Sequence, residues 1–383
     1  MNIKLWYRTF DYYLILPVLF LLTTSFVLVY SASPVIAQRL SLSQDYFIRR
    51  HTIYIVLSLI TLVTFSFLNT KAILNLSFAY FTLFTILMAV VIMLGIEAKG
   101  AKRWLHIAKI SIQPSEFMRP FFSVVVASIL ASGMKFKMHI SIIIFLLVFT
   151  LLLLQPDFSM SMLLTYSFIG QMFAVCIPLL YFLCIAGIVT TGVTAAYLCF
   201  PHIKERIYNF LFFVQRNNFQ VTKSLEAFKR GQLTGVGPGE GNVKIFLPDC
   251  HTDFVFSVLA EEFGLIMCLA TLILFGIISA RLLYIVYREN ELFNMLAIFG
   301  ISIQFITQFI INIGVTLNVF PTTGITLPLL SYGGSSLLSS SIALGIILSF
   351  SRNQTIALNF RERIMLAPCS GFETAHNCRN IRF

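Results

Sequence analysis

The feature that most constrains this chain is a series of long apolar segments that recurs along almost its whole length. Ten stretches come close to, or exceed, the roughly 20 residues that an α-helix needs to cross the ~30 Å hydrocarbon core of a bilayer. They cover residues 12–32, 51–68, 73–95, 115–133, 138–155, 158–175, 177–200, 253–281, 293–316 and 335–351. A spanning segment must satisfy its backbone polar groups internally, which favours helices. We therefore predict an all-α integral membrane protein with about ten transmembrane helices.

Composition supports a membrane protein over a soluble one. Hydrophobic residues make up 58% of the chain and charged residues only 11%, too few to cover the surface of a soluble protein of 383 residues. We predict one polytopic membrane domain over residues 1–351, with a long loop at 201–252. Residues 352–383 are polar and bear several arginines, so we expect them to form a mobile tail.

The loops divide between the two sides of the membrane in a way that does not depend on orientation. Loops 33–50, 96–114, 156–157, 201–252 and 317–334 share one side, with 14 Lys and Arg residues against 12 on the other. Without loops 96–114 and 201–252 the count becomes three against 12, which places both termini in the cytoplasm. The two excluded loops then carry positive charge on the outer face.

Two explanations are open for the positive charge on the outer face: contact with lipid headgroups and binding of an anionic ligand. In a soluble protein a net charge of +11 would suggest a nucleic-acid partner. In a membrane protein, basic loops more often contact lipid headgroups or an anionic ligand, so we expect no nucleic acid.

Polar motifs lie at four places, all on the outer side. The first is a basic cluster at 99–103 followed by Gln113-Pro114-Ser115-Glu116. Pro114 suits the first turn of the next helix, and Ser115 can cap that helix. Glu116 and Arg119 are one turn apart and can form an ion pair, although ionisable groups inside spans are often functional.

The second motif is Gln155-Pro156-Asp157. Pro156 interrupts the apolar run and leaves Asp157 at the membrane surface. On its chemistry alone, Asp157 is best explained as the cap of the helix that follows.

The third motif lies at the end of the long loop, where glycines at 235–241 precede His251-Thr252-Asp253. Glycine amides can cradle a phosphate, but the Lys-Ser/Thr ending of a P-loop is absent. Asp253 can cap the next helix. Alternatively, a carboxylate kept ionised by the helix dipole can accept a proton from a hydroxyl or hold a divalent metal.

The fourth motif, PTTGITLPLLSYGGSS at 321–336, combines prolines, glycines and hydroxyls. It predicts either irregular backbone that lines a cavity at membrane depth or an ordinary turn before the last helix. The four motifs contain no nucleophile triad, metal-ligand cluster or nucleotide fingerprint. Their chemistry indicates an outer-face site with carboxylates and basic residues.

Together, the four motifs resemble the SEDS family (shape, elongation, division and sporulation), whose members are membrane polymerases of peptidoglycan glycan strands. The resemblance rests on GAKRWL at 100–105, QPSE at 113–116, LPDCHTDFVFSVLAEEFG at 247–264 and TGITLPLLSYGGSS at 323–336. With the ten-span plan it covers nearly the whole chain, and it is closer to the division branch than to the elongation branch. The chain departs from the family pattern at Asp249, where glutamate is common, and at Ala108-Lys109.

The resemblance implies a peptidoglycan glycosyltransferase that polymerises lipid II during cell division, by an inverting transfer with undecaprenyl diphosphate as the leaving group. The family's HTDF motif implies that Asp253 is the catalytic base. Positive charge for the diphosphate would come from basic residues or a divalent cation, Mg or Mn, with no organic cofactor. The residues expected to bind substrate are Lys102, Arg103, Trp104, Gln113, Ser115, Glu116, Asp157, Lys244, His251, Thr252, Ser331, Tyr332, Gly333 and Gly334.

Two alternatives remain open at this point, a transporter that flips lipid II and a non-catalytic division scaffold. Ionisable residues inside the spans, such as Glu261 and Glu262, would suit a transport path. The resemblance also implies a monofunctional penicillin-binding transpeptidase and other division proteins as partners. It places the protein in the bacterial cytoplasmic membrane, at the division septum.

Overall fold

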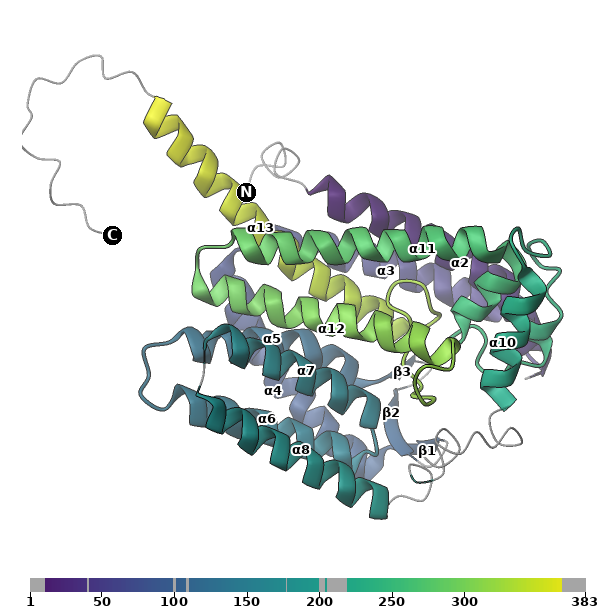
Figure 1. The fold of residues 1–383 in the computed structure, drawn as a ribbon, viewed down its shortest axis with the longest axis horizontal. Coiled ribbons are helices and arrows are strands. Elements are labelled where there is room, and N and C mark those ends of the chain that lie inside the picture. Colours follow the sequence, from purple (N-terminus) through teal and green to yellow (C-terminus); the bar gives the residue numbers. More distant parts are fainter. Residues whose placement is uncertain are drawn as a thin grey trace, which may run out of the picture.

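Long helices lying side by side form most of the molecule (Figure 1). The computed structural model describes residues 11–39, 41–98, 101–107, 110–176, 178–199, 204 and 219–366. Its helices are α2 (Tyr12–Arg39), α3 (Tyr46–Phe67), α4 (Thr70–Leu94), α5 (Pro114–Ala131), α6 (Lys137–Leu154), α7 (Phe158–Ala174), α8 (Leu179–Cys199), α10 (Phe219–Gly231), α11 (Val255–Arg288), α12 (Leu292–Thr316) and α13 (Gly334–Leu366). Each of the ten predicted apolar segments coincides with one of these helices.

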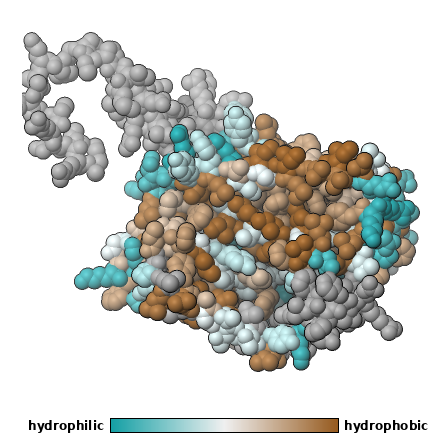
Figure 2. All heavy atoms as spheres, in the orientation of Figure 1, coloured by the Kyte–Doolittle hydropathy of each residue, from teal (hydrophilic) through white to brown (hydrophobic). Residues whose placement is uncertain are grey.

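Seven of the described helices are long and apolar enough to cross a membrane: α2, α3, α4, α6, α11, α12 and the first part of α13. A broad hydrophobic band crosses the face seen in Figure 2, and hydrophilic residues gather toward its two ends. The prediction of an all-α integral membrane fold is confirmed. The number of ten spans stays a prediction, because α5, α7 and α8 fall outside the seven.

The central helices of the bundle are α5 and α12. Helix α12 packs against α5, α7, α11 and α13, while α5 also contacts α4, α6 and α13. Almost every side chain of α5 is buried, including most of its polar ones. Polar groups on these two helices are therefore shielded from lipid and from water, and each needs a partner inside the protein.

Loop 96–114 forms a small sheet that the sequence did not predict. Strands β1 (Ile96–Ala98), β2 (Ala101–Ile107) and β3 (Ile110–Ile112) are antiparallel in the order β1-β2-β3. In this register Lys102 lies opposite Glu97 and Trp104 opposite Ile96. Lys102 and Arg103 of the basic motif are therefore held on a paired strand at the end of the bundle.

Helix α11 is broken at Gly264, whose backbone (φ 73°, ψ −174°) is not helical. The amides of residues 265–266 donate to the carbonyls of residues 232–233 at 2.9 and 3.2 Å. The carbonyls of residues 261–262 accept from the amides of residues 236–237 at 3.0 Å each. The glycine-rich loop thus completes the hydrogen bonding that the break would leave unsatisfied.

This arrangement corrects two predictions. The span predicted at 253–281 consists of a short segment before Gly264 and a longer one that continues to Arg288. The phosphate-cradle interpretation of the glycine loop is wrong for the amides of residues 236–237, because they already bond to α11.

Two further helical segments differ from the prediction. The long outer loop contains α10, which packs on α11. The last helix, α13, continues to Leu366, so the first part of the predicted tail is helical. Residues 367–383 lie outside the described part of the chain.

Candidate active site

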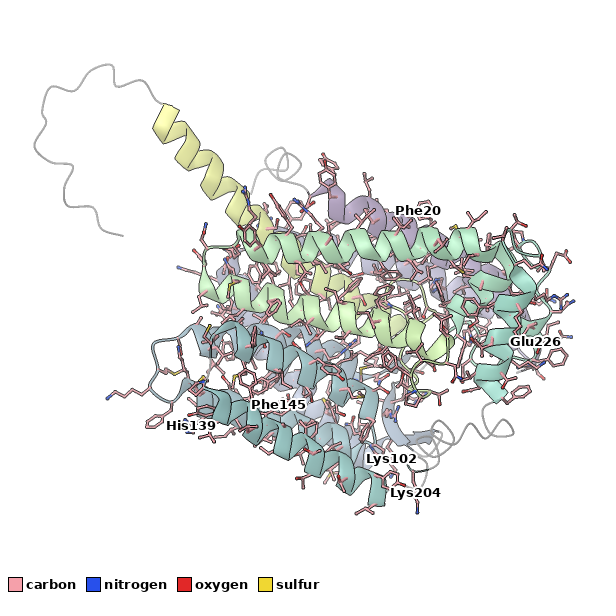
Figure 3. The ribbon with its side chains drawn as sticks, in the orientation of Figure 1. Phe20, Lys102, His139, Phe145, Lys204 and Glu226 are labelled. Atoms are coloured by element: carbon pink, nitrogen blue, oxygen red, sulfur yellow. The ribbon has the colours of Figure 1, made fainter. Side chains whose placement is uncertain are left out.

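The four polar motifs meet at one end of the bundle. Figure 3 shows Lys102 and Glu226 at this end and His139 at the opposite end. The backbone amide of Gln113 donates to the Ser335 hydroxyl at 3.2 Å, and this hydrogen bond joins the first motif to the fourth. Ser159, just after the second motif, donates to the carbonyl of Thr323 in the fourth at 2.5 Å. The motifs thus lie at one end of the bundle, which is the arrangement that a shared side of the membrane requires.

The backbone of the His251-Thr252-Asp253 motif is fixed at three consecutive carbonyls. These carbonyls accept, in order, from the backbone amide of Tyr332 at 2.8 Å, the hydroxyl of Ser331 at 2.5 Å and the side-chain amide of Asn312 at 2.9 Å. The third and fourth motifs and helix α12 therefore form one hydrogen-bonded unit around Asp253.

The Asp253 side chain is partly exposed and lies just before helix α11. The N-cap residue of α11 is Phe254, so the helix opens later than the sequence predicted. One carboxylate oxygen of Asp253 lies 3.7 Å from the position that a Cβ on Gly324 would occupy, and Gly324 has a φ of +74°. A carboxylate in this place benefits from the dipole of α11 and faces backbone rather than a bulky side chain.

An aromatic cluster supports the same motif from the side of α3. The Tyr332 ring lies 5.1 Å from that of His251, 5.4 Å from Phe47, 5.7 Å from His51 and 6.5 Å from Tyr54. Burial raises the pKa of the Tyr332 phenol to about 12, so this group remains protonated at neutral pH.

The two glycines after Tyr332 were predicted to bind substrate. A Cβ on Gly334 would lie 2.6 Å from the Tyr54 ring, so the close packing of α13 against α3 explains this glycine. A Cβ on Gly333 would meet only ordinary contacts, the nearest 3.4 Å from Ser336. The packing argument therefore applies to Gly334 alone.

The first two motifs join around the carboxylate of Asp157, which is buried. A guanidinium nitrogen of Arg103 lies 3.7 Å from this carboxylate, and Arg103 also donates to the Pro156 carbonyl. Gln113 donates to the carboxylate at 3.1 Å and Ser115 at 3.5 Å. The strand that carries Arg103 is thereby tied to the ends of α5 and α7.

Two capping predictions apply to these residues. Asp157 is the N-cap of α7 and accepts from the Met160 amide, as predicted. Ser115 is not a cap, because α5 begins at Pro114 with Gln113 in the N-cap position. The Ser115 hydroxyl points to Asp157 instead.

Glu116 and Arg119 are both buried on α5, below the Asp157 network. Arg119 donates to Gln308 of α12 at 3.0 Å, and the ion pairs found among the described residues do not include one between Arg119 and Glu116. The two side chains are close enough to interact electrostatically, but they do not form the contact ion pair that the sequence suggested. One oxygen of Glu116 is buried without a hydrogen-bond partner.

Lys244 was predicted to contact substrate, but its ammonium is bonded to other groups of the protein. Its ammonium is buried, 2.5 Å from Glu262, 2.9 Å from the Ser31 hydroxyl and 3.1 Å from the Gly239 carbonyl. The carboxylate of neighbouring Glu261 accepts hydrogen bonds from the three backbone amides of residues 242–244, at 2.7, 2.8 and 3.0 Å. The two glutamates thus hold the outer loop onto the broken helix.

The expected divalent cation finds no ready site among the described residues. No group of three or more His, Cys, Asp or Glu side chains there is arranged to hold a metal ion. The described side chains therefore supply no cluster of that kind for a resident metal.

The family model for FtsW, RodA and SpoVE, described as "Cell cycle protein", matches residues 12–356. The chain belongs to this family. The match covers all four motifs and every described helix except the last ten residues of α13.

Its relatives include two proteins named "Probable peptidoglycan glycosyltransferase FtsW". The one from Caulobacter vibrioides is 35% identical over 355 residues, or 91% of each chain. The one from Coxiella burnetii is 34% identical and covers 89% of this chain and 95% of its own.

Two solved structures share the fold. One comes from the work described as "Structural coordination of polymerization and crosslinking by a peptidoglycan synthase complex". It has a TM-score of 0.74 and 26% identity, and the match covers 90% of this chain and 98% of that one. The other, Thermus thermophilus RodA, has a TM-score of 0.66 at 24% identity, which indicates the fold alone; the match covers 90% of this chain and 97% of that one.

Two residues of α12 that hold the site together, Gln308 and Asn312, were not predicted from the sequence of this FtsW/RodA/SpoVE family protein. Asn312 and Gln308 lie one helical turn apart on α12, and both are buried. Both donate to the loop that follows α12, at Ile325 and Thr326. Amide side chains at i, i+4 spacing in an apolar span were a usable signal, because polar groups inside spans are costly unless they are paired.

Proposed function

We propose that this protein is a peptidoglycan glycosyltransferase that polymerises lipid II into glycan strands during cell division, with Asp253 as its catalytic base. The observation that carries the proposal is the fixed backbone of the His251-Thr252-Asp253 motif, which presents a partly exposed carboxylate at the end of the bundle where all four motifs meet. The names of the relatives support the activity and the division role.

The reaction assigns a task to each kind of group. Asp253 accepts the proton of the acceptor hydroxyl, and the oxygen attacks the anomeric carbon of the donor sugar. The bond from that carbon to the diphosphate breaks, and its electron pair leaves with undecaprenyl diphosphate. Attack opposite the leaving group inverts the configuration.

The departing diphosphate needs positive charge near it. Lys102 and Arg103 on β2 are partly exposed at this end of the bundle, which suits them to the role. Trp104 is on the same strand and is also partly exposed. We propose a divalent cation only as a companion of the diphosphate, since the described residues offer no resident site.

We further propose that a monofunctional penicillin-binding transpeptidase is the partner, with other division proteins, in the cytoplasmic membrane at the septum. The outer side is then the end that carries Asp253, and both termini are cytoplasmic. A structural relative from a peptidoglycan synthase complex supports such a partnership.

The test is polymerisation of purified lipid II by the purified protein, with and without the partner and with a chelator. Asp253→Asn should abolish glycan strands while insertion and partner binding persist. Asp45→Asn is the matched control, because Asp45 is an exposed carboxylate on a loop of the same side. Full polymerisation by Asp253→Asn would contradict the assignment of Asp253 as the catalytic base. Transport of lipid II in liposomes without formation of polymer would favour the transporter alternative.

A further inference from the structure

The buried side chain of Asn312 bridges two backbone carbonyls that belong to different motifs. Its amide nitrogen donates to the carbonyl of Asp253 at 2.9 Å and to that of Ile325 at 2.6 Å. A side-chain amide has two N–H donors, so both are used. Asn312 is only 1% exposed, which leaves its position set by the protein and not by solvent.

The bridge sets where Asp253 lies relative to the 321–336 motif. Gly324 immediately precedes Ile325, and a carboxylate oxygen of Asp253 lies 3.7 Å from the position of a Cβ on Gly324. The carboxylate therefore lies over the segment whose carbonyl Asn312 holds. Ser331 and Tyr332 bond to the two preceding carbonyls of the HTD motif, whereas Asn312 bonds to the carbonyl of Asp253 itself.

We propose that Asn312 is a positioning residue for the reaction, which holds the Asp253 carboxylate over Gly324 in the orientation that receives the acceptor's proton. This inference rests on the proposed function. A general base must lie within hydrogen-bond reach of its proton, and a displacement of about 1 Å can lower the rate about 100-fold. Asn312 is buried beneath the site, so its loss should affect turnover rather than substrate affinity.

The chain offers a matched control on the same helix. Asn294 is also buried (4% exposed) and also donates through its amide nitrogen, to Glu291 at 3.0 Å, but it lies at the opposite end of α12. Replacing either asparagine by alanine removes the same atoms from the same helix. Only Asn312 contacts the proposed base.

The experiment measures lipid II polymerisation and thermal unfolding for Asn312→Ala and Asn294→Ala in the full-length protein with its partner. We expect kcat of Asn312→Ala to fall about 100-fold with KM within about threefold of wild type, and kcat of Asn294→Ala to be unchanged. Should Asn312→Ala not be recovered folded, the isosteric Asn312→Asp carries the same expectation for kcat.

The isosteric variant breaks the bridge without a change of side-chain volume. An aspartic acid at 312, buried against two carbonyl oxygens, stays protonated and donates one hydrogen bond where asparagine donates two. The kcat of Asn312→Asp should therefore fall while KM and the unfolding temperature stay close to wild type, a split that a purely structural role would not produce. Asn294→Asp should leave kcat unchanged.

Three outcomes would overturn the inference: kcat of Asn312→Ala within about twofold of wild type, an equal loss of kcat in both alanine variants, or a wild-type kcat in Asn312→Asp. Failure of the proposed function looks different, because Asp253→Asn would then polymerise lipid II whatever happens at Asn312.

Discussion

The ammonium of Lys244 lies 2.5 Å from a carboxylate oxygen of Glu262, and both side chains are almost completely buried. The Ser31 hydroxyl of α2 also donates to this carboxylate, at 2.6 Å. The pair therefore connects the first helix of the bundle, the long outer loop and the broken helix α11. Its location favours a structural role over the contact with diphosphate that the sequence suggested.

This relationship predicts a specific pattern of stability. Removing one partner of a buried ion pair leaves the other charge unpaired, so Lys244→Met should lower the free energy of unfolding by about 3–5 kcal/mol. The double variant Lys244→Met/Glu262→Met should recover most of that loss, because it leaves no isolated charge. Thermal unfolding in detergent measures both effects.

Polymerisation by the double variant then separates the two roles of Lys244. A stable double variant that still makes glycan strands supports a structural pair. A stable but inactive double variant would contradict the structural role and support a contact between Lys244 and the substrate.

A second prediction concerns the glycine-rich loop. Gly235 has a φ of +80°, and a Cβ there would lie 2.2 Å from the backbone oxygen of Glu262. Gly239 has a φ of +86°, but a Cβ on it would meet nothing within 4 Å. Gly239→Ala should therefore cost about 1–2 kcal/mol of backbone strain, and Gly235→Ala about 1–3 kcal/mol more. Equal loss of stability in both variants would show that the contact with α11 is unimportant.

The fold was largely predictable because apolar segment length is a strong signal in membrane proteins. All ten predicted segments are helical. The four motifs meet at one end of the bundle, as expected from loops that alternate between the two sides of the membrane. Glu261 and Glu262 interrupt the apolar run just before Gly264, but hydropathy did not predict the break in α11, because only the contacts with residues 232–237 make it stable. The β-sheet of residues 96–112 was missed for a similar reason, since its strands are short and irregular in pattern.

The candidate site was predictable in its residue types but not in its pairings. Arg103, Gln113 and Asp157 were each identified, yet nothing in the sequence indicated that they form one network. Asn312 was missed because hydropathy identifies α12 only as an apolar span. The interaction that marks Asn312 is with a loop carbonyl 13 residues further along the chain. Contacts of this kind depend on tertiary structure and not on local pattern.

A third prediction isolates the interaction between Arg103 and Asp157. Asparagine is as good an N-cap as aspartate, so Asp157→Asn should preserve the start of α7 and change stability little. The variant loses the charge that faces Arg103, in a pair whose carboxylate is buried and whose guanidinium is partly exposed. Arg103 is then held less firmly for the diphosphate, and we expect kcat/KM to fall about fivefold, or about 1 kcal/mol of transition-state stabilisation. Asp157→Ala, which also loses the cap, should in addition lower the unfolding free energy by about 1 kcal/mol. A wild-type kcat/KM for Asp157→Asn would argue against a role for this pair in the reaction.

The last prediction uses Cys250, which directly precedes the HTD motif, as a reporter of motif opening. Its side chain is fully buried, and burial raises the pKa of its thiol to about 12, whereas Cys176 is exposed. Alkylation requires the thiolate, so iodoacetamide at pH 8 should modify Cys250 at least about 100-fold more slowly than Cys176. Raising the pH toward 12 should speed the reaction at Cys250, since the thiolate fraction increases until pH passes the pKa. Peptide mapping by mass spectrometry distinguishes the two cysteines without substitutions. Comparable rates at pH 8 would mean that the motif opens readily, and the hydrogen bonds to residues 251–253 would then not hold Asp253 in place.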